Sequence, residues 1–321
     1  MNTVDAVEIL VIVDNATDSL SSNPRFVETE FAGRLRRGMR QLGGACLCCA
    51  AHGLSCLVTA RRDGQSRTIL FDTGPDGWVF ERNAVRLGVD FGSIDAMVLS
   101  HGHWDHAGAM PQALQMINVA NGGRAVPTYM HPGMFVTRAL KMPDGRMMPV
   151  EDVPGVELLG ANGARVISTV EEQVILDGSF YISGEIPRVT AYERGLPGQH
   201  RLNAEGAWEP DELVMDERFV ALNVADKGLF VFTACSHAGL INVLTAARAR
   251  FPGVPLFGVM GGFHLAGATE LIIPQTVEDL AGFNLKVIVA AHCTGWRAIS
   301  ALAARFGAAL VNCAVGKRLM L

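Results

Sequence analysis

The sequence predicts an α/β protein whose polar residues gather at the ends of its strands. Short apolar runs, of the length of buried strands, alternate with segments of helical periodicity along most of the chain. Several of these runs end in a turn that carries an aspartate or a histidine, and the second half repeats the strand–turn–helix order of the first. Sheets of this class bind ligands beyond the carboxyl ends of their strands. We therefore expect the functional site where these turns meet.

The elements of the first half follow from periodicity and from turn residues. A strand at residues 7–15 has acidic neighbours and lacks a basic lead-in and a cleavage site, so it is not a signal peptide. Residues 16–44 are irregular and arginine-rich, and we interpret them as a solvated basic patch rather than a mobile loop beside the site. The further elements are a hairpin within 45–60 and 67–71, a helix at 78–90, a strand at 96–99, a helix through Met110, Leu114 and Ile117, and a strand at 126–130.

The second half contains a second hairpin and a series of strand–helix units. Its expected elements are strands at 219–223 and 228–233, a helix through Ile241 and Leu244, strands at 254–260 and 285–290, a helix at 296–306 and a last strand near 308–315. Residues 133–215 are the least patterned part, with many prolines and glycines and two short strands at 165–170 and 173–176. Long loops of this kind are usually functional, so we expect a substrate-facing insertion at about 133–215 within a single domain of residues 1–321.

Composition excludes several classes of partner and compartment. Hydrophobic residues make up 49% of 321 residues, which is enough for a sizeable core. The net charge of −5 predicts no nucleic-acid partner and no membrane-surface partner, and no apolar run approaches the ~20 residues that span a bilayer. Seven cysteines, an odd number, without a secretory signal predict reduced thiols and a cytoplasmic protein. We expect a small-molecule substrate as the partner, and the sequence is also compatible with a homo-oligomer.

The stretch Ser100 to Met110 carries the clearest chemical signal. It reads SHGHWDHAGAM and places His101, His103, Asp105 and His106 within six residues, on a turn between a strand and a helix. His101 and His103 can lean to one side of an extended segment, whereas Asp105 and His106 follow as the chain turns and can address a second position. Two ions about 3.5–4 Å apart are a standard hydrolytic device. Imidazoles with a carboxylate suit zinc, and iron or manganese is also compatible.

Further histidines and cysteines stand at other expected strand ends. His237, His264 and His292 each follow a strand of the second half, and a metal motif elsewhere in the chain strengthens all three as candidates. His131 is equally compatible with a pocket wall and with a structural strand end. The group Cys46, Cys48 and Cys49 lacks a second CxxC pair, so we favour buried thiols over a metal–thiolate site.

The pattern His-x-His-x-Asp-His after an apolar strand resembles the signature of the metallo-β-lactamase superfamily. The resemblance implies an αββα sandwich, in which two mixed β-sheets pack face to face between outer helices, with the site along one edge. It implies a binuclear site that binds one or two zinc ions. The ligands of the first position would be His101, His103 and His237, and those of the second would be Asp105, His106 and His292. Asp72, in the string FDTG, would support the ligands.

One departure from the family pattern concerns the position between the two late histidines. Many members have an aspartate there that bridges both ions, whereas this chain offers His264 in the string GGFH. An imidazole nitrogen cannot bridge two ions as a carboxylate does, so His264 is expected to be a ligand, a proton shuttle or a hydrogen-bond donor to the substrate. Cys293 could bind a soft metal, but a packed thiol is the preferred interpretation.

Strings along nearly the whole chain resemble one branch of that superfamily, which includes a dihydropterin-ribofuranosylaminobenzene phosphate synthase. They are VDN at 13–15, AHGLS at 51–55, FDTG at 71–74, GEIPR at 184–188, CSHAG at 235–239 and HCTG at 292–295. They nominate Asn15, His52, Glu185 and Arg188 as substrate-binding residues, with ordinary loop hydrogen bonds as the alternative role. We expect a metal-dependent hydrolase of an ester, lactone or phosphoester, with Asp105 and His264 as catalytic residues. The alternative is a metal-dependent transferase of the synthase type.

Overall fold

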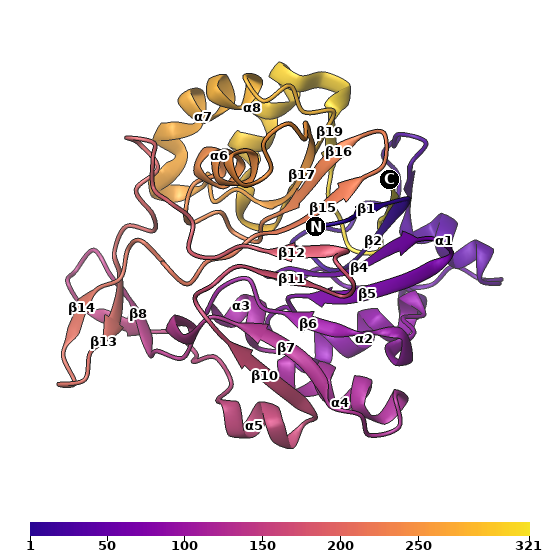
Figure 1. Cartoon of the computed structure of the whole chain (residues 1–321), viewed down its shortest axis with the longest axis horizontal. Helices are drawn as coiled ribbons and strands as arrows, with labels where there is room; N and C mark the ends of the chain where they lie inside the picture. The colour runs from indigo at the N-terminus through magenta and orange to yellow at the C-terminus, as the bar shows by residue number, and fades with distance from the viewer.

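Two eight-stranded mixed β-sheets pack face to face, and helices cover both outer faces (Figure 1). This computed structural model describes all 321 residues. The arrangement is the αββα sandwich expected from the sequence. No helix is both long enough and apolar enough to cross a bilayer.

Each sheet collects strands from both ends of the chain. The first sheet has the order β10 (Ala164–Ser168), β7 (Val126–Met130), β6 (Ala96–Val98), β5 (Gln65–Phe71), β4 (Ser55–Arg62), β2 (Ala6–Val13), β20 (Arg318–Met320) and β3 (Val27–Glu28). The second has the order β11 (Gln173–Ile175), β12 (Phe180–Ile182), β15 (Val220–Val224), β16 (Gly228–Phe232), β17 (Leu256–Gly262), β18 (Val287–Ala291) and β19 (Leu310–Asn312), with β1 (Thr3–Val4) beside β15.

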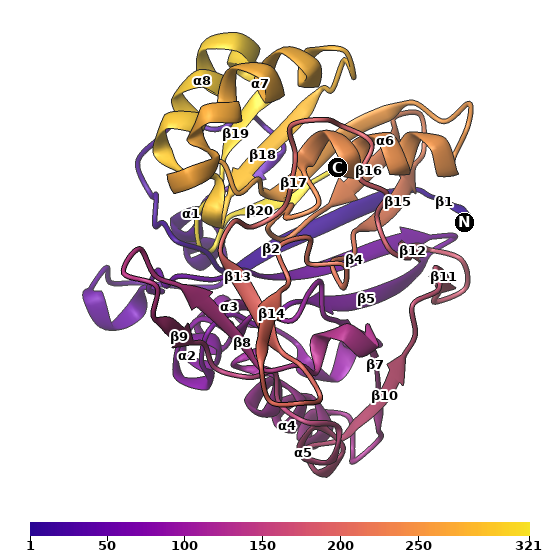
Figure 2. The same cartoon turned by 90° about the vertical axis from the view of Figure 1, so that its left-hand side faces the viewer.

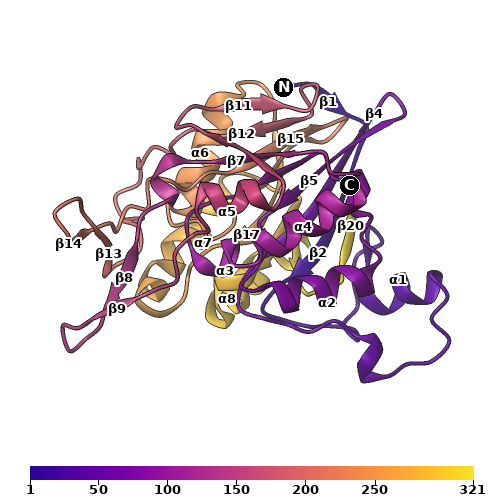
Figure 3. The ribbon, with the colours of Figure 1, turned by 90° about the horizontal axis from the view of Figure 1, so that it is seen from below.

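The alternation of side chains along the strands builds the layers. In β16, Phe230 and Phe232 face the other sheet, whereas Leu229 and Val231 face the outer helices. Burial of one such side chain stabilises the fold by roughly 1.5–3 kcal/mol. Helices α6 (Leu240–Arg250), α7 (Ile273–Ala281) and α8 (Trp296–Phe306) cover the second sheet. The first sheet is covered by α2 (Gly77–Leu87) and α4 (Met110–Ala120), which lie in front in Figure 3.

Local signals account for the ends of the elements, and for two that the sequence did not reveal. The side chain of Asp76 caps the start of α2, and Gly88 in the left-handed conformation ends it, so the helix stops earlier than the expected residue 90. Within the region expected to be irregular, α1 (Glu30–Arg36) forms behind the capping residue Thr29, but it buries too few residues to show a period. The strand expected near 308–315 is β19, and β20 follows it and pairs with β2.

The stretch 133–215 divides into parts with different places in the fold. Helix α5 (Val156–Ala161) and β10 extend the first sheet layer, and β11 and β12 extend the second sheet. The other parts pair with each other into a separate sheet of order β14 (Trp208–Pro210), β13 (Gln199–Leu202), β8 (Arg138–Lys141) and β9 (Met147–Pro149). We call these four strands the small sheet, which faces the viewer in Figure 2. The stretch is therefore not one continuous insertion.

Candidate metal centre

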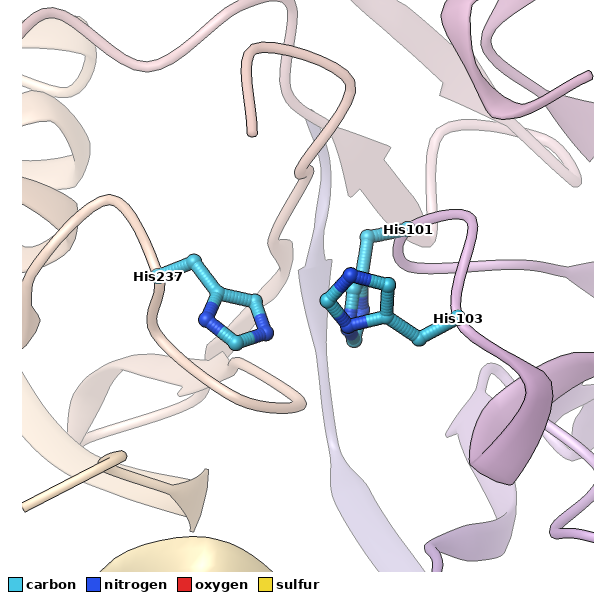
Figure 4. A group of neighbouring side chains, drawn as sticks. All are labelled: His101, His103 and His237. Atoms are coloured by element: carbon cyan, nitrogen blue, oxygen red, sulfur yellow. The ribbon is translucent and has the colours of Figure 1, made fainter. Parts of the chain in front are cut away.

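Strand ends from both main sheets bring three histidines together. His101 and His103 follow β6 of the first sheet, and His237 follows β16 of the second. In Figure 4 the ring of His237 points from its own loop toward the other two. The ring centroids are 4.5 Å apart for His101 and His103, 4.9 Å for His101 and His237, and 4.8 Å for His103 and His237. One nitrogen of each ring can therefore face a shared point, and we call these residues the first ligand group.

A second group lies beside the first. Asp105 and His106 lie on the short helix α3 (Trp104–Ala107), and His292 follows β18. Oδ2 of Asp105 lies 3.2 Å from Nε2 of His292 and 3.7 Å from Nε2 of His106. His52 joins them, with its Nε2 3.4 Å from the same carboxylate oxygen. Asp105, His106 and His292 form the second ligand group, and the two groups adjoin where the rings of His101 and His106 lie 4.4 Å apart.

Hydrogen bonds hold one ring nitrogen of each first-sheet histidine and leave the other free. The hydroxyl of Ser100 donates a hydrogen bond to Asp72. Its oxygen can therefore accept a hydrogen bond from Nδ1 of His101, 2.9 Å away. Nε2 of His103 lies 2.6 Å from Oε1 of Gln199, and it can donate because that oxygen only accepts. The free nitrogens, Nε2 of His101 and Nδ1 of His103, then lie 3.0 Å apart on the side of His237.

The second group is oriented in the same way by different partners. Nδ1 of His106 lies 2.7 Å from Oδ2 of Asp72, and Nδ1 of His292 lies 2.9 Å from Oδ1 of Asn15. Nε2 of each ring is thereby left for another partner. Second partners of this kind fix the tautomer and direction of metal-ligating histidines.

Several buried nitrogens have no hydrogen-bond partner in the protein. Both ring nitrogens of His237 lack one, as do Nε2 of His292 and Nδ1 of His264. A buried polar atom left in this state costs about 1–3 kcal/mol. The residues therefore fit a metal ion, which would take up these lone pairs.

The electrostatics also suit a cation. Burial, followed by the neighbouring imidazoles, holds the pKa values of His101 and His237 well below their usual range, so both rings are neutral and able to ligate. Burial would lower the pKa of His106 too, but the carboxylates of Asp105 and Asp72 outweigh it and raise that pKa to about 9. Burial opposes ionisation of Asp105, yet His106 and His292 bring its pKa well below the usual range. The second group thus favours positive charge.

Backbone strain concentrates at the same strand ends. Asp72, Ser236, His264 and His292 all have positive φ, between 43° and 59°. Such conformations cost of order 1–3 kcal/mol in non-glycine residues and persist where the surrounding structure imposes them. Gly102 has a different reason to lack a side chain: a Cβ there would lie 2.4 Å from Nη1 of Arg138 and 2.8 Å from Cα of Met134. The absence of a side chain at Gly102 therefore leaves room for the arginine.

A cavity of about 340 Å³ opens above the two groups. Asn15, His52 and His264 line it, and the ring of His264 lies 4.6 Å from that of His237. The apolar part of the wall comes from the small sheet and the turns beside it: Ala139, Leu140, Val150 and Leu196. The small sheet thus forms one wall of the pocket.

The structure does not bring the other two predicted substrate-binding residues to this cavity. The guanidinium of Arg188 donates to the backbone carbonyls of Ile186, Leu213 and Val214. Glu185 lies in a separate depression, with Oε1 3.5 Å from Nε2 of His131. The string GEIPR lies on the loop after β12, and none of its residues lines the cavity.

Sequence reasoning missed two residues of the site. Cys235 places its Sγ 3.2 Å from Nε2 of His106, and the only signal was its position two residues before His237. Gln199 reaches His103 from a stretch without any pattern, and no sequence signal could have found it.

Known proteins resemble this chain in both sequence and fold. Residues 53–179 match the family model described as the metallo-beta-lactamase superfamily. The chain is 28% identical, over 251 residues, to the 7,8-dihydropterin-6-methyl-4-(beta-D-ribofuranosyl)-aminobenzene-5'-phosphate synthase of Methanocaldococcus jannaschii, an alignment that covers 77% of this chain and 82% of that protein. The fold is similar to the crystal structure of Tm1679, a metal-dependent hydrolase of the beta-lactamase superfamily, with a TM-score of 0.71, 22% identity and 98% of each chain covered. It is also similar to the metallo-beta-lactamase fold protein YhfI from Bacillus subtilis, with a TM-score of 0.50, 13% identity and 99% and 100% of the two chains covered.

Proposed function

We propose that this chain, which belongs to the metallo-β-lactamase superfamily, is a metal-dependent hydrolase that cleaves an ester, lactone or phosphoester bond with water. The observation that carries the proposal is the pair of adjoining ligand groups at the floor of one cavity, with several buried ring nitrogens lacking a protein partner. In this proposal His101, His103 and His237 hold one ion, and Asp105, His106 and His292 hold a second. Zinc suits these donors best, and iron or manganese is an alternative.

Bound ions would supply a Lewis acid and an activated water at neutral pH. The protein residues position the reaction and move its protons. Asp105 lies between His52 and His292, so its carboxylate can both ligate and accept a proton, with half-exposed His52 leading towards solvent. His264 lies on the cavity wall beside His237, where its ring can donate a hydrogen bond to a substrate oxygen.

The charge of the cavity favours one class of substrate. Arg138 is its only arginine or lysine, and its guanidinium is paired with Asp211, at 2.9 Å, and with Asp216. Beyond the bound ions, no unpaired cationic side chain is left to balance a polyanion, and one wall is apolar. Neutral esters or lactones with an apolar substituent therefore fit better than highly charged phosphoesters.

The test combines metal analysis with a substrate panel. The purified protein is expected to contain zinc and to hydrolyse members of a panel of esters, lactones and phosphoesters, and a chelator should abolish this turnover until metal is restored. His103→Ala should reduce both metal content and turnover. His200→Ala, which removes a histidine outside the cavity, should change neither. Unchanged metal stoichiometry in His103→Ala would refute the ligand assignment.

The name of the relative from Methanocaldococcus jannaschii supports a second candidate, a transferase of the synthase type. In that reaction an amine would replace water as the nucleophile and a diphosphate would depart. A pterin diphosphate with an aryl amine acceptor should be turned over only under this second candidate, and the ester and lactone panel only under the first.

A further inference from the structure

The thiol of Cys235 lies at the carboxyl end of β16, between the two ligand groups. Its side chain is buried, and its Sγ is 3.2 Å from Nε2 of His106. No other side chain takes part in as many close clusters of donor atoms. Within 4.8 Å of its sulfur are donor atoms of His101, His106, His237, His264, His292 and Cys293.

We propose that Cys235 is a metal ligand whose thiolate sulfur contacts both ion positions; this inference rests on the metal centre of the proposed function. On binding, the S–H bond breaks, its proton passes to solvent, and the electron pair left on sulfur forms the metal–sulfur bond. No electron is transferred, and no oxidant or reductant is needed.

The distances on the two sides of the sulfur are those of ligands that share an ion. Bond lengths of about 2.3 Å to sulfur and about 2.0–2.1 Å to nitrogen put tetrahedral ligand atoms roughly 3.6 Å apart. The separation of Cys235 Sγ and His106 Nε2 is 3.2 Å, and the nitrogens of His101 and His237 lie within 4.8 Å on the other side.

A sulfur ligand at this position would also take the place of the bridging carboxylate that this chain lacks. His264 follows β17, at the place where a bridging carboxylate would be expected, but an imidazole nitrogen has a single lone pair. Thiolate sulfur has several lone pairs and can contact two cations at once. Cys235 would therefore link the two positions from β16 instead of β17. Because thiolate is a soft ligand, it would favour zinc or iron over magnesium or calcium.

The neighbouring thiol does not have the same surroundings. Sγ of Cys293 lies 3.7 Å from the carbonyl oxygen of Cys235, and a Cβ on Gly262 would come within 2.6 Å of it. Cys293 takes part in a single close cluster of donor atoms, with Cys235 and His292, whereas Cys235 takes part in three, and the thiol of Cys293 has a backbone carbonyl to donate to. This difference makes Cys293 a matched control, since it lines the same cavity with the same atom.

The test loads the full-length protein with cobalt(II) and measures the sulfur-to-cobalt charge-transfer absorption in the near ultraviolet, together with metal stoichiometry. The wild type, Cys293→Ala and Cys313→Ala should show the band, since Cys313 is buried away from the cavity. Cys235→Ser should lose the band and bind metal about 10-fold or more weakly. Cys235→Asp should lose the band but recover metal stoichiometry, because a carboxylate can also bridge.

Persistence of the band in Cys235→Ser, or its loss in Cys293→Ala alone, would overturn the proposal. If Cys235→Ser fails to fold, zinc X-ray absorption of the wild type and of Cys293→Ala decides: both should show a sulfur neighbour at about 2.3 Å. Bound zinc with only nitrogen and oxygen neighbours would overturn the role of Cys235 and leave the hydrolase proposal intact. A wild type that binds no metal would overturn both.

Discussion

The two ligand groups differ in what supports them and in their charge. The first group consists of three imidazoles, and His103 depends on Gln199 of the small sheet. The second contains a carboxylate, and its supports, Asp72 and Asn15, belong to the main sandwich; Asp72 also reaches His101 of the first group through Ser100. The first position is thus completed by a part of the chain that also forms the pocket wall. The second is built into the core fold and would persist without that wall.

Arg138 links the small sheet directly to the turn that carries the first ligand group. It begins β8, and Nη1 donates to the carbonyl of Gly102, at 2.8 Å, between the two histidines of the motif. Asp216 joins the same network by accepting from the amide of Gly102, also at 2.8 Å. Docking of the small sheet therefore shapes the turn that carries the first group. The pocket wall and the geometry of the first group are coupled there.

The largest effect is expected from removal of the carboxylate that supports the second group. Asp72 is fully buried and accepts from the amide and hydroxyl of Ser100 and from His106. Asp72→Ala should lower the free energy of unfolding by about 3–5 kcal/mol, because three buried donors lose their acceptor. Denaturant unfolding measures this, with Asp144→Ala at an exposed surface pair as a control that should not change. Equal stability of Asp72→Ala and the wild type would contradict the comparison.

The two ligand groups should also differ in their contribution to the pH dependence of the free energy of unfolding of the metal-free protein. The folded-state pKa of His106, about 9, lies above its value of about 6.5 in the unfolded chain. The resulting stabilisation is fully present below pH 6.5 and is lost as the pH rises through 9, and its size is on the order of 3 kcal/mol. Above about pH 7.5 the first group does not contribute, because its rings are neutral in both states; at lower pH the unfolded chain binds protons that the folded rings do not, so their depressed pKa values reduce stability there.

Unfolding titrations at several pH values test this, with Asp72→Asn as the comparison. Removal of that charge should lower the pKa of His106 and flatten the fall in stability above pH 6.5. Cysteine ionisation in the unfolded state affects both proteins alike and cancels in the difference. If the free energy of unfolding falls equally with pH in the wild type and in Asp72→Asn, groups other than His106 cause the fall.

Periodicity and strand-end chemistry predicted an α/β protein with histidines at several strand ends, whereas the αββα sandwich and the two ligand sets came from the resemblance to a known superfamily. His237 and His292 could be placed because each follows a strongly apolar strand, and parallel strands end at one edge. The small sheet could not be predicted, since its strands have three or four residues and little apolar alternation. Gln199 meets His103 across 96 residues of sequence, through contacts that no local pattern encodes.

A substitution in the small sheet should weaken metal binding at the first position only, which tests the difference between the two ligand groups. Gln199→Ala removes the acceptor for Nε2 of His103 and should weaken metal binding at the first position about 10–100-fold, because the tautomer is no longer fixed. Binding at the second position should be unchanged. Gln199→Glu keeps an acceptor oxygen and should bind like the wild type. Calorimetric zinc titration separates the two sites, and equal weakening of both would show that the groups do not depend on different supports.

The smallest effect is expected at the exposed support of the second position. Asn15 accepts from Nδ1 of His292 at 2.9 Å and from the amide of Gly53 at 3.1 Å. Because Asn15 is exposed, water can replace its oxygen in Asn15→Ala, so zinc binding at the second position should weaken by about 10-fold or less. Asn15→Asp keeps the acceptor and serves as the control, and the same titration reports both variants. A loss at the first position would mean that the sandwich supports both groups, and the division between them would fail.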